Sequence, residues 1–162
     1  MLIKLKNKHT LIIDDFKFKC CVGKNGITIN KKEGDNCTPK GKFKIGSIYY
    51  RADRVAKPIS KIKIKKITKN MLWCDDPYKK DYNKQIYINK KTKGERIYRN
   101  DYKYTYFIVI EYNTKLTKPN KGSAIFLHLT KNYQKTAGCI AMDKKDYLIM
   151  LKIINKNSKI II

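Results

Sequence analysis

Several residue types are scarce in this 162-residue chain, and each shortage excludes a class of protein. It contains 8 Gly, 4 Pro and 5 Cys, too few for a collagen-like repeat or a disulfide scaffold. No uninterrupted apolar run approaches the roughly 20 residues of a membrane-spanning helix, so we expect no membrane span. Only two histidines are present, His9 and His128, and the cysteines lack the paired spacing of zinc ligands. We therefore expect no metal and no other cofactor. The odd cysteine count leaves at least one thiol without a disulfide partner inside the chain.

Acidic residues and arginine are also scarce. Against 38 Lys plus Arg stand 13 Asp plus Glu, which gives a formal charge of +25. Only four of the basic residues are Arg, the side chain that nucleic-acid readers use for bidentate contacts, and no groove-reading motif is present. We therefore expect no dedicated nucleic-acid binding. The scattered lysines, among many Ile and Asn, are also typical of a biased codon pool. A field this positive still attracts polyanions such as anionic lipid or an acidic cell wall.

The composition nevertheless favours a folded protein. Apolar residues make up 42% of the chain and aromatic residues 11%, which excludes a disordered polar tail. The length fits a single domain spanning 1–162, with no internal repeat and no linker. Residues 1–8 alternate Lys with Leu and Ile and lack the continuous apolar segment of a secretory signal peptide.

Short apolar segments separated by turn residues predict a mainly-β fold. We expect strands at 2–5, 10–13, 16–22, 27–29, 43–50, 59–67, 85–88, 104–112, 123–129 and 159–162. The segments 31–41, 70–84 and 114–122 are expected to be loops. One helix follows Asp143, which can cap it, and apolar residues recur at helical spacing up to Ile154. The prediction is a β fold with this C-terminal helix packed on the sheet.

One histidine and one cysteine stand out as candidates for chemistry. His128 ends an expected buried strand, and Cys139 follows after a polar segment. A thiol acts as a nucleophile only as thiolate, and a nearby imidazole can take its proton. Gly138 lets the backbone approach a substrate closely, so that amides near Cys139 can face a developing oxyanion. On spacing alone the catalytic signal is weak, and a buried structural cysteine with a structural histidine is the favoured interpretation.

A resemblance favours the catalytic interpretation. Residues 122–128, which end in His128, followed by Thr136-Ala137-Gly138-Cys139, resemble the L,D-transpeptidase catalytic-domain family. That family carries a histidine, a spacer and then Ser/Thr-His-Gly-Cys. The element Thr-Pro-Lys-Gly-Lys-Phe at 38–43 is similar to its Thr-Pro-x-Gly-x-Phe. The segments 23–26, 32–35, 50–54 and 73–77 resemble a compact proteobacterial branch, so the resemblance extends from about residue 23 to 142.

The resemblance implies a β-sandwich or barrel and a set of site residues. Cys139 is the implied nucleophile and His128 its general base, oriented by the backbone carbonyl of Leu129. Thr136 and Gly138 are implied to shape the oxyanion pocket. The chain departs from the motif at two positions: Ala137 replaces a second histidine, and Ala141 replaces a frequent arginine. The spacer is also shorter than usual.

The implied substrates are peptidoglycan stem peptides. Transfer of the acyl group from Cys139 to an amine would make the protein a transpeptidase that forms crosslinks. Hydrolysis of the same thioester would make it an L,D-carboxypeptidase or amidase, and the departures from the motif leave this open. A third hypothesis is a basic binding module for anionic polymers with an inert Cys139. The resemblance implies the cell envelope or periplasm, while the missing signal peptide leaves a cytoplasmic role open.

Five further residues are candidates for substrate binding. Arg51 and Arg54 can pair with a stem carboxylate, or can be structural partners of nearby acids. Asp75, close to Trp73, belongs either to an acidic site or to the turn that Asp-Asp-Pro favours. Tyr112 can line a groove or pack in the core.

Overall fold

The computed structural model describes residues 1–89 and 93–162. Its elements, in chain order, are β1 (Leu2–Asn7), β2 (Thr10–Ile13), β3 (Phe16–Cys21), β4 (Ile27–Thr28), β5 (Thr38–Pro39), β6 (Lys42–Tyr50), β7 (Ile64–Lys66), β8 (Met71–Trp73), β9 (Gln85–Tyr87), β10 (Glu95–Arg96), the 3₁₀ helix η1 (Lys103–Thr105), β11 (Tyr106–Ile110), β12 (Phe126–Leu129), β13 (Ile140–Met142), α1 (Lys144–Ile153) and β14 (Lys159–Ile161). No helix in these described residues is long and apolar enough to cross a membrane.

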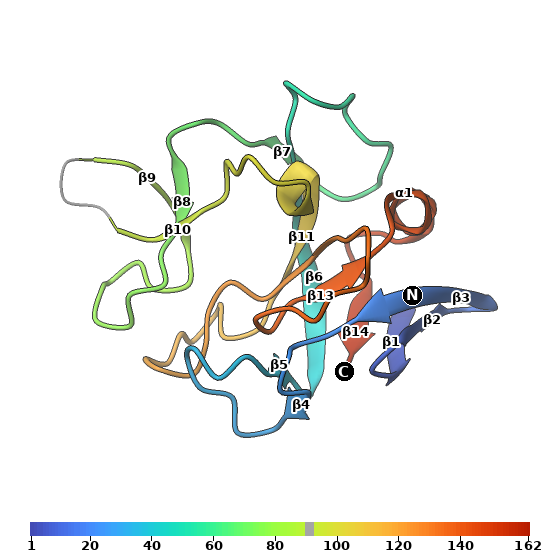
Figure 1. Ribbon diagram of the computed structural model, residues 1–162, viewed down its shortest axis with the longest axis horizontal. Coiled ribbons are helices and arrows are strands. Elements are labelled where there is room, and N and C mark those ends of the chain that lie inside the picture. The colour runs from blue at the N-terminus through green and yellow to red at the C-terminus, as the bar shows by residue number, and fades with distance from the viewer. Residues whose placement is uncertain (90–92) are drawn as a thin grey trace.

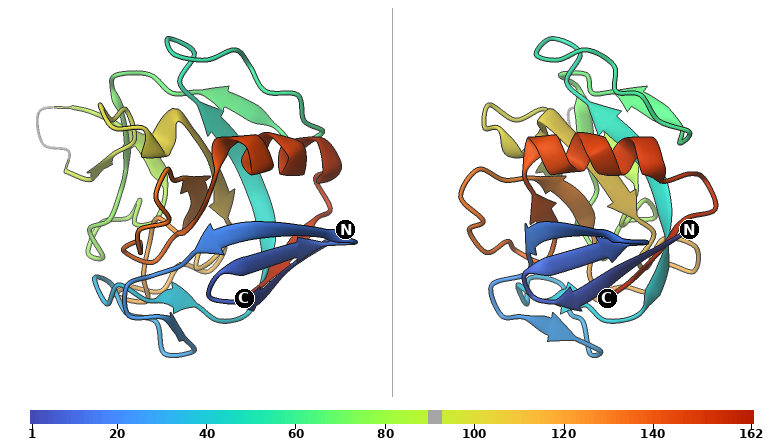
Figure 2. Two further views of the ribbon diagram at one scale, coloured as in Figure 1. Left: turned by 45° about the vertical axis from the view of Figure 1, so that its right-hand side comes forward. Right: turned by 90° about the vertical axis from the view of Figure 1, so that its right-hand side faces the viewer.

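The main sheet closes into a barrel. Its strand order is β11-β12-β13-β3-β2-β1-β14-β6, and β6 pairs again with β11. Two of these pairs, β1 with β14 and β12 with β13, are parallel, and β7 also pairs in parallel with the last residues of β6. The β1–β14 pairing sets the first and last strands of the chain side by side (Figure 2). A sheet closed in this way leaves few strand edges unpaired.

The barrel interior is the main hydrophobic core. Alternate residues of a strand point to opposite faces, and one face of each barrel strand supplies this cluster. From β12 and β13, the inward residues are Leu127, Leu129, Ile140 and Met142. Helix α1 contributes buried Tyr147, Met150 and Leu151 to the same cluster. The helix therefore packs on the barrel, as the sequence predicts.

A second cluster covers part of the outer face of the barrel. Strand β11 is buried along its whole length, with Ile108 in the main core and Phe107 in the second cluster. The ring of Trp73 in β8 packs edge-on against Phe126, with centroids 4.9 Å apart. Strand β8 forms a small sheet with β9 and β10, which lies on the side of β6 and β11 opposite α1 (Figure 1). This outer layer supplies one wall of the candidate site.

The mainly-β class and the C-terminal helix are confirmed, but several local predictions are wrong: the expected loop 31–41 contains β5, and the expected strand 104–112 begins in η1. Of the expected strand 59–67, only Ile64–Lys66 forms a strand, because it pairs with the last three residues of β6 alone. Of 123–129, the first three residues precede the strand, and Ala124 has a φ of 51°. The expected loop 70–84 contains β8, whose three residues are all buried, so that no alternation marks them.

The predicted helix start can be tested at Asp143. Its side chain accepts a hydrogen bond from the amide of Lys145 at 2.7 Å. We expect Asp143→Ala to lower the free energy of unfolding by about 1 kcal/mol, because a first-turn amide loses its partner. Asp143→Asn keeps an acceptor and should recover most of this loss. Urea denaturation measures both, and equal losses in the two variants would contradict a capping role.

Candidate active site

The pairing of β12 with β13 places His128 and Cys139 on the same face of the barrel. In this parallel pair His128 lies opposite Ala141, and extending the register sets Cys139 beside Phe126. Leu127 lies between Phe126 and His128 on β12 and points into the barrel, so the side chains of Phe126 and His128 point outward. Cys139 and Phe126 accordingly belong to the outer cluster. Two residues 11 positions apart in the chain thereby become diagonal neighbours on adjacent strands.

Cys139 is a buried thiol with two backbone partners. The residue is only 9% exposed. The Sγ donates to the carbonyl oxygen of Ala124 at 3.2 Å and accepts from the amide of Phe126 at 3.4 Å. Burial raises the pKa of the thiol to about 12. The resting sulfur therefore carries its proton at neutral pH.

His128 is a buried imidazole in a defined orientation. Its Nδ1 lies 2.9 Å from the carbonyl oxygen of Leu129. A carbonyl only accepts hydrogen bonds, so Nδ1 carries the proton and Nε2 is free of it. The ring of Tyr104 packs edge-on against the imidazole at 5.5 Å. Burial lowers the pKa of His128 to about 4; the contact with Leu129 opposes this shift, and the cations of Lys103 and Arg99 add to it.

Both side chains line one cavity of about 520 Å³. A volume of this size is typical of small-molecule and peptide sites. The lining carries both signs of charge, from the carboxylates of Glu33, Asp75, Glu95 and Asp101 and from the cations of Lys31, Arg99, Lys103, Lys131 and Lys135. Burial, followed by repulsion from Glu33, raises the pKa of Asp75 above its usual range. The phenol of Tyr104 donates to Glu95, so one ring supports both the histidine and a wall carboxylate.

A tight turn precedes Cys139. The Thr136 hydroxyl accepts from the amide of Gly138 at 3.1 Å and donates to the carbonyl oxygen of Cys139 at 2.6 Å. Gly138 has a φ of 136°, and a Cβ added there would lie 2.8 Å from the carbonyl oxygen of Cys37. Glycine is therefore required at 138 both by conformation and by space.

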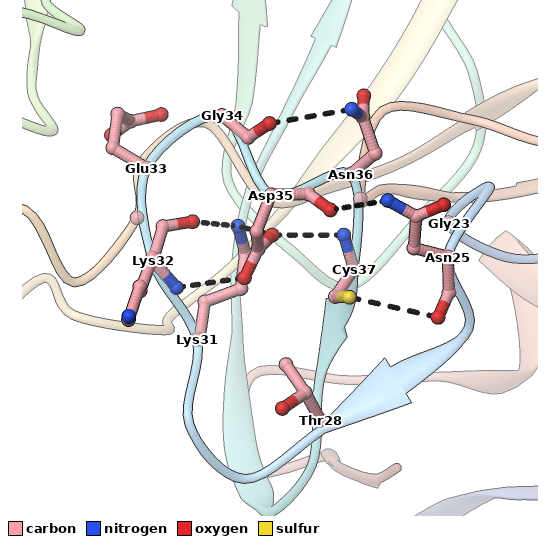
Figure 3. A network of polar contacts seen from close by, with 12 residues as sticks. Gly23, Asn25, Thr28, Lys31, Lys32, Glu33, Gly34, Asp35, Asn36 and Cys37 are labelled. Atoms are coloured by element: carbon pink, nitrogen blue, oxygen red, sulfur yellow. Dashed lines mark hydrogen bonds and ion pairs between the residues drawn. The ribbon is translucent and has the colours of Figure 1, made fainter.

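The loop against this turn is stabilised by one carboxylate. Asp35 accepts from the ammonium of Lys31 at 2.6 Å and from the amides of Lys32 and Cys37 at 2.7 and 2.8 Å (Figure 3). Lys31 is only 4% exposed, yet it lines the cavity. The network fixes the loop whose Cys37 carbonyl approaches Gly138, and the same loop lines part of the cavity with Lys31 and Glu33.

The structure brings only one of the five predicted substrate-binding residues to the cavity, namely Asp75. Arg51 instead makes a bidentate pair with Asp53 at 2.8 Å and donates to the carbonyl of Arg99. Arg54 donates to the carbonyls of Asn100 and Asp101. The two arginines therefore hold their turn against the 99–101 segment, and their guanidinium groups are already engaged.

Trp73 and Tyr112 also lie outside the cavity lining. The indole of Trp73 is buried and donates to Asn83 at 2.9 Å. Tyr112 packs edge-on against Phe43 at 5.4 Å. The sequence reasoning missed Lys31, Tyr104 and Glu95 as wall residues. No local signal marks them, because Lys31 is one of many lysines and Tyr104 lies in a segment that reads as an ordinary strand.

A protonated thiol and a neutral imidazole that share a cavity form a site suited to cysteine-dependent acyl transfer. No cluster of three or more His, Cys, Asp or Glu able to hold a metal occurs within residues 1–89 and 93–162. The model of the YkuD family, the L,D-transpeptidase catalytic domain, matches residues 2–162, and the chain belongs to this family. Members of this family act on peptidoglycan, usually in the periplasm or cell wall. No curated protein matches the chain.

The crowding at Gly138 leads to a stability test with a matched control. Gly138→Ala introduces backbone strain of about 1–2 kcal/mol and a collision with the Cys37 carbonyl. Gly34 also has a positive φ, 72°, but a Cβ there meets nothing within 4 Å. We expect Gly138→Ala to lower the free energy of unfolding by about 1–3 kcal/mol more than Gly34→Ala, since only the former is overpacked. Equal losses in urea denaturation would show that the close approach to Cys37 is unimportant.

The buried imidazole predicts a pH dependence of stability. With the pKa of His128 lowered to about 4 from 6.5, the unfolded chain binds the proton more readily. The stability from the neutral ring is complete above pH 6.5 and is lost as the pH falls through 4. Between pH 7.5 and 4.5, we expect the free energy of unfolding of the unsubstituted protein to fall by about 2–3 kcal/mol more than that of His128→Gln.

Denaturation curves at both pH values measure this difference. The exposed His9 gives the control, because His9→Gln should leave the loss on acidification unchanged. A His128→Gln variant with the same loss on acidification as the unsubstituted protein would contradict a buried neutral ring.

Proposed function

We propose that residues 1–162 act as one catalytic domain, a peptidoglycan L,D-transpeptidase with Cys139 as nucleophile and His128 as general base. One observation carries the proposal: the thiol and the imidazole line the same cavity, and the contact of Nδ1 with Leu129 leaves Nε2 free to take a proton. Membership in the L,D-transpeptidase family supports this reaction class and a peptidoglycan substrate.

The first half-reaction forms an acyl-enzyme. The Sγ of Cys139 attacks the carbonyl carbon of the amide between an L-centre and the terminal D-residue of a stem peptide, and its proton passes to Nε2 of His128. The tetrahedral intermediate then breaks its C–N bond, and His128 returns the proton to the leaving amine of the D-amino acid. A thioester on Cys139 remains.

Proton transfer in this scheme is coupled to bond formation. Burial sets the pKa of the thiol at about 12 and that of His128 at about 4, so the neutral pair is the resting state. The proton moves as the S–C bond forms and the negative charge passes from sulfur to the carbonyl oxygen. The Phe126 amide stabilises charge on sulfur, while Thr136 and Gly138 hold the turn that shapes the oxyanion pocket.

The second half-reaction decides between transfer and hydrolysis. An amine of a second stem peptide resolves the thioester with formation of a crosslink, whereas water gives a shortened stem. We favour transfer, because the sulfur is buried and exclusion of water protects a reactive thioester. Ala137 and Ala141, which replace a histidine and an arginine of the common motif, affect which acyl donor the site accepts.

Charged groups around the cavity support binding of a charged peptide. Lys103, Lys131 and Lys135 are suited to stem carboxylates, and we propose that Asp75 contacts a substrate ammonium. The net charge of +25 favours encounter with an anionic cell wall, in a manner that salt weakens. This substrate places the proposed activity in the cell envelope.

Mass spectrometry with a carbapenem, a β-lactam acylating agent, tests the nucleophile. We expect one adduct on Cys139, none in Cys139→Ala, and formation slowed about 10²- to 10⁴-fold in His128→Ala, which lacks the base. Muropeptides incubated with the protein separate the two outcomes of the second step: new dimers indicate transfer and shortened monomers indicate hydrolysis. An unchanged protein mass together with salt-sensitive polyanion binding would favour the non-catalytic binding module.

A further inference from the structure

Asn83 is a buried side chain on which three segments of the chain converge. It is only 3% exposed and has a φ of 59°. Its Oδ1 accepts from the indole of Trp73 at 2.9 Å and from the amide of Ala124 at 3.0 Å. Its Nδ2 donates to the carbonyls of Tyr112 and Asn113 at 2.9 and 2.8 Å. Both lone pairs and both protons of the amide are therefore in use.

The residue that links this amide to the active site is Ala124. Its φ of 51° lies in the left-handed region, where alanine is strained, so contacts around it must hold it there. Its amide is held by Asn83, and its carbonyl oxygen accepts the hydrogen bond from the Sγ of Cys139 at 3.2 Å. A chain of two hydrogen bonds thus runs from Asn83 through one strained residue to the thiol.

We propose that Asn83 is a positioning residue for the nucleophile: by fixing Ala124, it aims the carbonyl oxygen that orients the thiol of Cys139. The inference rests on the proposed function only in taking Cys139 as the nucleophile. The carbonyl accepts the S–H proton but repels a thiolate, so the same contact keeps the resting sulfur protonated. Loss of Asn83 should therefore ease deprotonation of the thiol while impairing its orientation.

Two substitutions at 83 separate these effects. Asn83→Gly tolerates the positive φ and removes all four hydrogen bonds. Asn83→Asp keeps the acceptor for Ala124 and Trp73 but replaces the donor to Tyr112 and Asn113 by a carboxyl oxygen that faces their carbonyls. The stability control is Leu151→Ala, which leaves a void in the main core, away from the residues that line the cavity.

Two rates at Cys139 are measured by peptide mass spectrometry, which resolves it from the other four cysteines. Alkylation by iodoacetamide as a function of pH reports deprotonation, and acylation by a carbapenem reports orientation. For Asn83→Gly we expect acylation to fall at least about tenfold, while the alkylation profile moves to lower pH. Asn83→Asp should lose less acylation than Asn83→Gly, because it keeps the acceptor for the Ala124 amide, and Leu151→Ala should change neither rate despite a lower melting temperature.

If Asn83→Gly does not fold, the double variant Asn83→Gly with Ala124→Gly relieves the strain at 124 without restoring the hydrogen bond. An unchanged alkylation profile in the glycine variant would overturn the proposal, and so would an Asn83→Asp variant as impaired in acylation as Asn83→Gly. If a carbapenem fails to acylate the unsubstituted protein, the proposed function fails, but the alkylation profiles still decide the role of Asn83.

Discussion

The parallel pairing of β12 with β13 is the constraint on which the candidate site depends. It sets His128 opposite Ala141 and leaves Cys139 one residue before the strand, on the same outward face. A shift of one residue in this register would turn either side chain into the barrel, where Leu127 and Ile140 lie. The remaining features of the site hold this geometry and close it from water.

The outer layer gives the site its chemistry. Packing of β8 and the aromatic rings over the barrel wall removes water from both reactive groups, which raises the pKa of the Cys139 thiol and lowers that of His128. The reactive pair therefore rests in its neutral form. Two polar side chains brace the surrounding loops, Asp35 on one side and Asn83 on the other.

Features encoded by local sequence were predictable, whereas features that depend on distant partners were not. The helix after Asp143 followed from its cap and its spacing, and the buried strand around Ile108 from its apolar run. Arg51 was an open choice between ligand and structural partner, because the sequence does not reveal that Arg99, 48 residues away, offers it a carbonyl. Strand β8 escaped notice because burial on both faces erases the alternation that marks a strand.

The sequence by itself determined the family and the mainly-β class and indicated the two candidate residues, His128 and Cys139, since a motif and a period of two are properties of neighbouring positions. Only the tertiary structure decided which charged groups face the sulfur and which are engaged elsewhere. It also decided that Ala124, an unremarkable residue in the sequence, holds the thiol. Such contacts join segments far apart in the chain, and their formation depends on the packing of the whole fold.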